Sequence, residues 1–252
     1  MINLLIYFIK KDFKTKYAGS GLGLIWAFLL PVFQVLLFWF VFAGIMKARP
    51  YANSQMPYLY FLLSSFFFWL AFSEGLSRSS NIILENAEIV KKVSFPTIVL
   101  PITATLSSYL HHLIGFAIFV LIYTVTGSFS PILLLVIPVL LIQITFSAGL
   151  GMIFSALLPY IRDLGQIMGY VLQGIFFISP IMYSIDTIPE RFRIIFYFNP
   201  LTYFAMSYQK IILFYKPPEL YHIFIILLLA IFSIIAGIFI FNKLKDGFAD
   251  VL

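Results

Sequence analysis

Residues 93–161 read VSFPTIVLPITATLSSYLHHLIGFAIFVLIYTVTGSFSPILLLVIPVLLIQITFSAGLGMIFSALLPYI, and these 69 positions contain no Asp, Glu, Lys or Arg. A charged side chain at the centre of a lipid bilayer is costly, so long uncharged stretches mark segments that cross a membrane. A helix of about 20 residues spans the roughly 30 Å of hydrocarbon. The stretch is therefore long enough for two spans, at about 97–124 and 131–158, joined by a turn-rich segment at 126–131.

The rest of the chain is organised in the same way. Four more uncharged intervals predict one span each, at about 22–46, 57–74, 164–184 and 221–242. Of the 252 residues, 62% are hydrophobic and only 10% are charged, against roughly 25% charged in soluble domains. We therefore predict an all-α integral membrane protein with a single transmembrane domain, residues 1–252, of six transmembrane helices.

The distribution of basic residues predicts the orientation of the chain. An even number of spans places both termini on the same side, and cytoplasmic loops carry an excess of Lys and Arg. With a cytoplasmic N-terminus, ten of the 16 Lys and Arg residues fall on the cytoplasmic side and six on the outer side. We therefore predict a multi-pass protein with both termini in the cytoplasm.

Residues 2–17 form a separate amphipathic element. Leu4, Leu5, Phe8, Ile9 and Phe13 recur at helical spacing, and Lys10, Lys11 and Lys14 fall on the opposite side. Such a helix lies in the membrane interface. The other interpretation, a frayed start of the first span, is disfavoured because the small residues at 18–21 interrupt the pattern. The lysines follow the apolar stretch at 2–9, unlike those of a cleaved signal, so we expect this segment to be retained.

Two loops are longer than a simple connection requires. The first contains a mixed-charge, helix-forming segment at 80–93, with Glu88 and Lys92 at i,i+4 spacing. It is either a partner-binding helix or a solvated surface helix, and the residues themselves do not favour one interpretation. The second loop, 186–216, is apolar and aromatic, and we expect it to re-enter the membrane or to lie on the outer leaflet.

Several kinds of chemistry are missing from the sequence. There is no Cys, which excludes thiolate metal sites, thiol nucleophiles and disulfides. There is no G-x-x-x-x-G-K-[ST] loop to hold ATP, and no H-E-x-x-H or G-x-S-x-G motif. We therefore expect no catalytic residue and no cofactor bound by this chain, and an energy source outside it.

The remaining ionisable residues disfavour metal binding and ion coupling. His111 and His112 are adjacent in the third predicted span, where neighbouring residues do not share a helix face, so we expect a packed or interhelical hydrogen-bonding pair and no metal site. All ten carboxylates fall at or beyond the ends of uncharged spans, which argues against an ion-coupled carrier. The net charge of +6 lies in short patches, which favours membrane lipids over nucleic acid as partners.

Aromatic residues make up 19% of the chain, more than two belts at the headgroups require. Aromatic faces stack on sugars without strong hydrogen bonds, so an aromatic path can hold a polysaccharide loosely enough for it to slide. The candidates are Trp26, Phe33 and Trp39 in the first span, with Phe176, Phe177 and Tyr183 in the fifth. For any one of them a lipid-facing or belt position is the more frequent role, and only the excess as a group favours a path.

Five motifs, in order, carry a resemblance to a known family. They are the segment KDFKTKYAGSGLGLIW at 11–26, with Pro31 and Phe42 after it; NAEIVKKVSFP at 86–96, with Pro101 after it; Arg162-Asp163; SPIMY at 179–183; and Asn199-Pro200-Leu201. Together they cover nearly the whole chain. The sequence resembles the permeases of ABC exporters for O-antigen, capsule and teichoic-acid polymers, which are type-2 ABC transporter membrane components.

This resemblance implies an assembly in the bacterial inner membrane. Two permease copies form a homodimer with two copies of a separate P-loop ATPase, which binds the ATP and Mg²⁺, and the channel carries a lipid-linked polysaccharide. The segment at 80–93 would be the coupling helix that docks on the ATPase. Its candidate coupling residues are Asn81, Glu85, Asn86, Glu88, Lys91 and Lys92.

The resemblance further implies that segment 186–216 forms short re-entrant helices gating the outer exit. Many relatives have an acidic residue and an Arg after the Asn-Pro motif, where this chain has Met206 and Gln209. If that pair guides the polymer head or its pyrophosphate, the role has moved or been lost here. Arg191 and Arg193 are then either its replacements or residues that only anchor the loop at the headgroups. Two alternatives remain open. One is a permease of the same architecture for a drug or small lipid, which the short outer loops disfavour. The other is a membrane enzyme acting on polyprenyl-linked sugars, which the lack of an acidic cluster disfavours.

Overall fold

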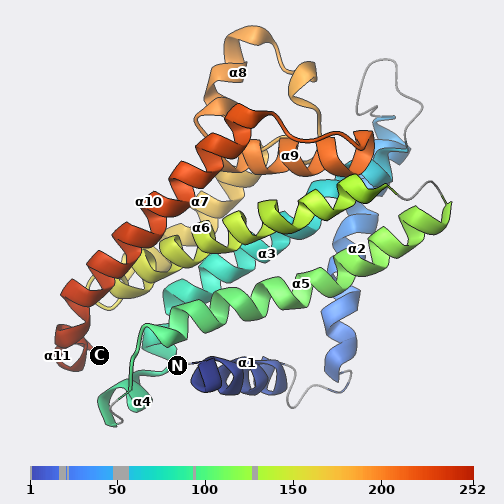
Figure 1. Ribbon diagram of the computed structural model, residues 1–252. Coiled ribbons are helices and arrows are strands. Elements are labelled where there is room, and N and C mark those ends of the chain that lie inside the picture. The colour runs from blue at the N-terminus through green and yellow to red at the C-terminus, as the bar shows by residue number, and fades with distance from the viewer. Residues whose placement is uncertain (1, 17–20, 22, 48–56, 93–94, 127–129) are drawn as a thin grey trace.

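The computed structural model describes residues 2–16, 21, 23–47, 57–92, 95–126 and 130–252, and in these ranges the chain is helical with no strand. Figure 1 shows long helices running side by side along one direction. Both chain ends, with α1 (Ile2–Lys16) and α4 (Ala87–Lys92), lie at one end of this bundle, and α8 (Glu190–Tyr197) lies at the other. Termini at the same end agree with an even number of crossings.

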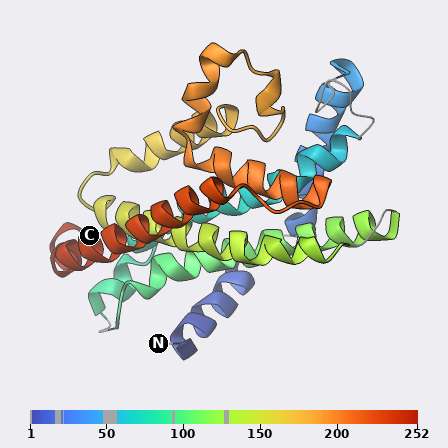
Figure 2. The same ribbon diagram turned by 45° about the horizontal axis from the view of Figure 1, so that its top comes forward.

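Among the described residues, four helices are long and apolar enough to cross a membrane. They are α3 (Tyr58–Glu85), α5 (Val99–Thr126), α6 (Val136–Leu157) with the preceding 3-10 turn η3 (Pro131–Leu135), and α10 (Leu220–Leu244). The chain ends in the short helices η5 (Lys245–Gly247) and α11 (Phe248–Val251). These four correspond to the second, third, fourth and sixth predicted spans, and Figure 2 shows them packed together in a second view.

The first and fifth predicted spans are shorter helices. The 3-10 turn η1 (Gly23–Ile25) leads into α2 (Trp26–Trp39), which continues as the π-helix η2 (Phe40–Ile45). Helix α7 (Asp163–Phe177) ends well before residue 184, so the predicted fifth span is too long. The physical reason is Pro180, which lacks an amide hydrogen and disfavours helical geometry in the residue before it.

Helices α6 and α10 approach each other through two glycines. A Cβ atom at Gly149 would lie 2.4 Å from the carbonyl carbon of Ser233, and one at Gly237 would lie 2.5 Å from the carbonyl oxygen of Gly149. Small residues let helix backbones touch in a membrane, where apolar burial between helices offers little driving force. This contact fixes the position of α10, whose remaining surface is mostly exposed.

Helix α1 is a separate element, as predicted, and it packs against α5 at the end of the bundle that carries the termini (Figure 1). Phe8 stacks near Phe95, which precedes α5, with ring centroids 5.9 Å apart. Part of the apolar face of α1 is thus covered by protein contacts. An interfacial position for its other side stays a prediction.

The predicted coupling segment is divided differently in the structure. Residues 80–85 continue α3, since Ser80 and Ile83 are buried there, and only 87–92 form the separate helix α4. Asn86 leaves helical geometry at the junction, and its side-chain amide donates to the carbonyl of Ile82. The predicted pair of Glu88 and Lys92 is formed on α4. The prediction of an independent helix over 80–93 is therefore wrong for residues 80–85, which belong to α3.

The predicted outer segment folds into three short pieces at the opposite end of the bundle (Figure 1). They are η4 (Ile185–Thr187), α8 (Glu190–Tyr197) and α9 (Pro200–Phe214). Helix α9 begins where the Asn199 side chain accepts a hydrogen bond from the Leu201 amide, with Pro200 at the first position. It ends at Tyr215, whose φ of 50° is left-handed.

Candidate functional site: a polar network beside a cavity

A cavity of about 630 Å³, the main cavity below, lies between α2, α3, α5 and α7. Its wall includes Trp26 and Gln34 of α2, Glu74 of α3, and His111 and His112 of α5. A second, apolar cavity of about 570 Å³ lies between α2, α3 and α5 and shares Pro31 and the two histidines with the first. The histidine pair therefore stands where the two cavities adjoin.

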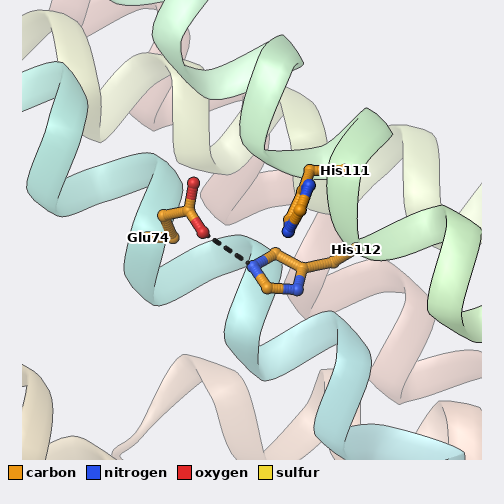
Figure 3. A group of neighbouring side chains, drawn as sticks. All are labelled: Glu74, His111 and His112. Carbon is orange, nitrogen blue, oxygen red and sulfur yellow. Dashed lines mark hydrogen bonds and ion pairs between the residues drawn. The ribbon is translucent and has the colours of Figure 1, made fainter. Parts of the chain in front are cut away.

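The two histidines come together on one side of α5. Both are buried, their ring centroids are 4.9 Å apart, and Figure 3 shows the rings on the side of α5 that faces Glu74. Nε2 of His112 lies 2.9 Å from Oε2 of Glu74. The expected interhelical hydrogen bond is confirmed for His112, but the expectation that adjacent histidines cannot meet is wrong. Imidazoles are long enough to turn toward the same cavity although their Cβ atoms diverge.

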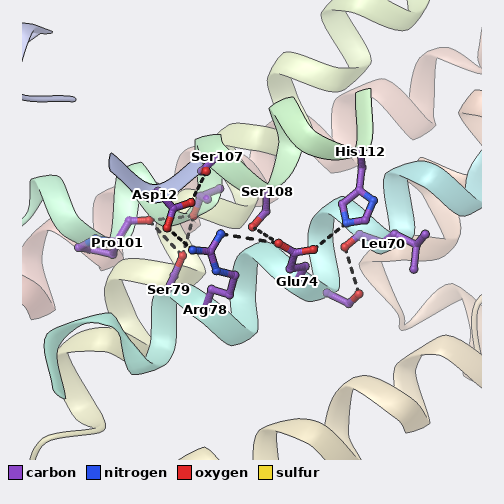
Figure 4. A network of polar contacts seen from close by, with 11 residues as sticks. Asp12, Leu70, Glu74, Arg78, Ser79, Pro101, Ser107, Ser108 and His112 are labelled. Carbon is purple, nitrogen blue, oxygen red and sulfur yellow. Dashed lines mark hydrogen bonds and ion pairs between the residues drawn. The ribbon is translucent and has the colours of Figure 1, made fainter. Parts of the chain in front are cut away.

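From this pair a polar network runs to the N-terminal helix (Figure 4). Glu74 also accepts a hydrogen bond of 3.2 Å from Ser108 and lies 3.6 Å from the guanidinium of Arg78. Arg78 in turn donates to Asp12 of α1, which also accepts from Ser107. Three helices are joined by these contacts, and each charged group has an opposite charge or a donor beside it.

The network corrects the predicted position of one carboxylate. The sequence places Glu74 at the end of the second span, but it lies near the middle of α3 and faces His112 near the middle of α5. The cause is the continuation of α3 to Glu85. The inference that every carboxylate lies at or beyond a span end therefore does not hold for Glu74.

Removing the central cation should destabilise the fold measurably. Arg78→Met is expected to lower stability by about 2 kcal/mol, because it leaves Asp12 and Glu74 as half-buried carboxylates without their shared partner. Thermal melting of the detergent-solubilised chain measures the effect. The matched control is Lys92→Met, which breaks an exposed pair and should leave melting nearly unchanged. Equal melting of the two variants would show that the network contributes nothing to stability.

The predicted coupling residues divide into two groups. The side-chain amides of Asn81 and Asn86 are used locally, donating to the carbonyls of Ser77 and Ile82. The others, Glu85, Glu88, Lys91 and Lys92, are exposed. They lie at the end of the bundle where both termini lie (Figure 1). A role of these residues in coupling stays a prediction.

Five of the predicted channel aromatics lie on α2 and α7, and Tyr183 follows the end of α7. The two helices are neighbours, since Phe38 of α2 packs on Phe176 of α7 with ring centroids 5.7 Å apart. Trp26, Phe33, Trp39 and Phe177 are exposed, and Phe33 retains 67% of its accessible surface. Phe176 is buried in the protomer and Tyr183 is half-buried, with its hydroxyl bonded to the carbonyl of Phe177. Their role along a polysaccharide path stays a prediction.

In the outer segment, Arg193 is turned inward. Its guanidinium donates to the carbonyls of Ile188, at 2.9 Å, and Asp186, at 3.1 Å, and so closes the turn between η4 and α8. Arg191 is exposed and lies over the ring of Phe192. Of the two predicted headgroup residues, Arg191 is therefore the one whose charge faces outward.

Two of the motifs that carry the family resemblance meet in space. The amide of Asn199 donates to Oγ of Ser179 at 2.7 Å and to the carbonyl of Ile178 at 3.1 Å. Gln209 donates to the carbonyl of Pro180 at 2.6 Å. The motifs thus hold the end of α7 against α9, and Gln209 has a structural task in this chain.

Residues 3–213 match the family model described as ABC-2 type transporter. The chain belongs to the ABC-2 type transporter family. It is 33% identical to an O-antigen export system permease protein RfbA of Klebsiella pneumoniae, over all of this chain and 96% of that protein. It is 25% identical to the RfbA of Myxococcus xanthus, over 98% and 94% of the two chains. It is 26% identical to the polysialic acid transport protein KpsM of Escherichia coli, over 77% and 74%. The resemblance drawn from the five motifs is confirmed.

Within this ABC-2 family member, the network of Asp12, Glu74, Arg78 and His112 was not predicted from the sequence. Residues that contact each other in this network are separated by up to 95 positions in the sequence, and no single motif contains them. One signal was present, because Glu74 and Arg78 have the i,i+4 spacing of a helical ion pair.

Proposed function

We propose that this chain is the permease subunit of an ATP-driven exporter that moves a lipid-linked polysaccharide of the O-antigen kind across the bacterial inner membrane. The observation that carries the proposal is 33% identity along the whole chain to a permease named for O-antigen export. The absence of an ATP-binding loop supports a separate ATPase chain, which would hold ATP and Mg²⁺.

The channel would form between two copies of the chain. Helices α2 and α7 neighbour each other and expose Trp26, Phe33, Trp39 and Phe177. These aromatic faces would form the sliding surface for the polymer. Phe176 would support that surface from behind, because its ring packs against Phe38, Phe66 and Trp69.

The ATPase would dock at the end of the bundle that carries α1, α4 and both termini, which we assign to the cytoplasm. Helix α4 offers exposed charges of both signs, suited to a complementary protein surface. The other end, with η4, α8 and α9, would form the outer gate, with Arg191 at the headgroups. There the hydrogen bond from Lys210 lowers the pKa of the Glu219 carboxyl.

The test is to delete the gene for this chain in its native host and to measure the polymer inside the cell and at the cell surface. Lipid-linked polysaccharide should accumulate inside the cell and disappear from the surface, and this chain should co-purify with a tagged ATPase encoded beside it. Surface polymer that persists in the deletion strain, with no ATPase bound to the purified chain, would contradict the proposal. Loss of a different lipid or drug from the exported fraction would instead favour the small-molecule alternative.

A further inference from the structure

Glu74, His111 and His112 bring three metal-binding side chains together inside the bundle. One ligand atom from each residue can be chosen such that all three lie within 4.8 Å of one another. The histidines retain only 7% and 6% of their accessible surface, and Glu74 is half-buried. Figure 3 shows the carboxylate of α3 pointing at the two imidazoles of α5.

The surroundings of this cluster resemble those that position metal ligands. Oε1 of Glu74 is held by Ser108 and by the charge of Arg78, which leaves Oε2 directed at His112. In metal sites, groups that hydrogen-bond to a ligating carboxylate orient it toward the metal in this way. Nδ1 of His112 is buried and has no hydrogen-bond partner among the described residues, so it can take up the ring proton when an ion binds the Nε2 lone pair.

The distances also suit one small cation. Nε2 of His112 and Oε2 of Glu74 are 2.9 Å apart. Two ligands of a tetrahedral Zn²⁺, each about 2.0–2.1 Å from the ion, are separated by roughly 3.3 Å. An ion can therefore take the place of the proton between these two atoms, and His111 supplies the third of the ligand atoms that lie within 4.8 Å of one another. The main cavity adjoins all three residues and leaves room for an oxygen ligand in the fourth position.

We propose that Glu74, His111 and His112 form a binding site for a divalent transition-metal ion that joins α3 to α5. Two imidazole nitrogens and one carboxylate oxygen are a donor set that suits Zn²⁺ and disfavours Mg²⁺ and Ca²⁺, which prefer oxygen ligands alone. The site is independent of the proposed transport activity, since it is built within one protomer and requires neither polymer nor ATPase.

The experiment uses the full chain with a tag that contains no histidine, purified in detergent and stripped with a chelator. Zn²⁺ titration should give one bound ion per chain, and Co²⁺ should give the visible absorption bands of a four-coordinate site. His112→Gln and Glu74→Gln should each weaken Zn²⁺ binding at least tenfold. The matched control is His222→Gln, which removes a buried histidine of α10 outside the cluster and should leave the affinity unchanged.

The wild-type measurements decide the matter even if a variant fails to fold. Zn²⁺ should raise the melting temperature of the wild type and of His222→Gln but not of Glu74→Gln, because a ligand that binds only the folded state stabilises it. Wild-type protein that takes up less than one ion per chain and gives no visible Co²⁺ bands would overturn the proposal. So would an equal loss of affinity in His222→Gln, and the cluster would then be a hydrogen-bonded contact alone.

Discussion

Gly149→Ala is expected to lower the melting temperature of this permease by roughly 6–12 °C. The added methyl group would lie 2.4 Å from the carbonyl carbon of Ser233 and 2.5 Å from its oxygen. These are backbone atoms of α10, so the clash is relieved only if the two helices move apart. Overpacking of this kind costs about 3 kcal/mol, and each kcal/mol shifts melting by about 2–4 °C in a chain of this length.

Gly174→Ala is the matched control for this prediction. It also adds one methyl group to a glycine inside a helix, but beyond the local backbone of α7 itself no heavy atom of the described residues lies within 4 Å of the new Cβ. Because alanine favours helix by about 1 kcal/mol over glycine, this variant should melt at the same temperature or higher. Melting is measured by fluorescence-monitored size-exclusion chromatography after heating. A Gly149→Ala protein that melts with the wild type would show that α6 and α10 are not in backbone contact.

The positions of the long helices were predictable because the cost of burying charge sets them. The uncharged stretch at 93–161 became α5 and α6, divided near the predicted turn. Where a helix ends was less predictable. Helix α3 continues to Glu85 because Ile83 is buried against neighbouring helices, and α7 stops before Pro180. Both ends depend on tertiary packing or on a local turn, which hydropathy does not report.

The polar network shows a second limit of sequence reasoning. The spacing of Glu74 and Arg78 indicates an ion pair on α3. It does not indicate that Asp12 bonds Arg78 or that His112 bonds Glu74. Those contacts depend on how α1 and α5 are placed against α3. The family resemblance could be drawn from short contiguous motifs such as Ser179-Pro180 and Asn199-Pro200, which contact each other at the end of α7. The network has no such contiguous pattern.

Reversing the charges of α4 is expected to abolish binding of the partner ATPase without harming the fold. Glu88 and Lys92 retain 80% and 72% of their side-chain surface and bond each other. The double variant Glu88→Lys with Lys92→Glu keeps an i,i+4 ion pair on α4 in the less favourable order, which should change helix stability by only about 0.5 kcal/mol. The exchange reverses the charges of the surface that we propose for the ATPase. Like charges placed across an interface cost several kcal/mol, which corresponds to at least a hundredfold weaker association.

Adding Lys91→Glu to this exchange reverses the third charged residue of α4 as well and should complete the loss. The measurement is the amount of permease recovered through a tag on the ATPase, together with polymer at the cell surface. The control exchanges Glu190 and Arg191 on α8, which are equally accessible but lie at the other end of the bundle, and should leave recovery unchanged. Recovery that survives the α4 exchange would place the ATPase elsewhere on this end of the molecule. The neighbouring groove that contains Lys11, Asp12 and Glu85 would then be the next surface to test, because α1 and the end of α3 meet there.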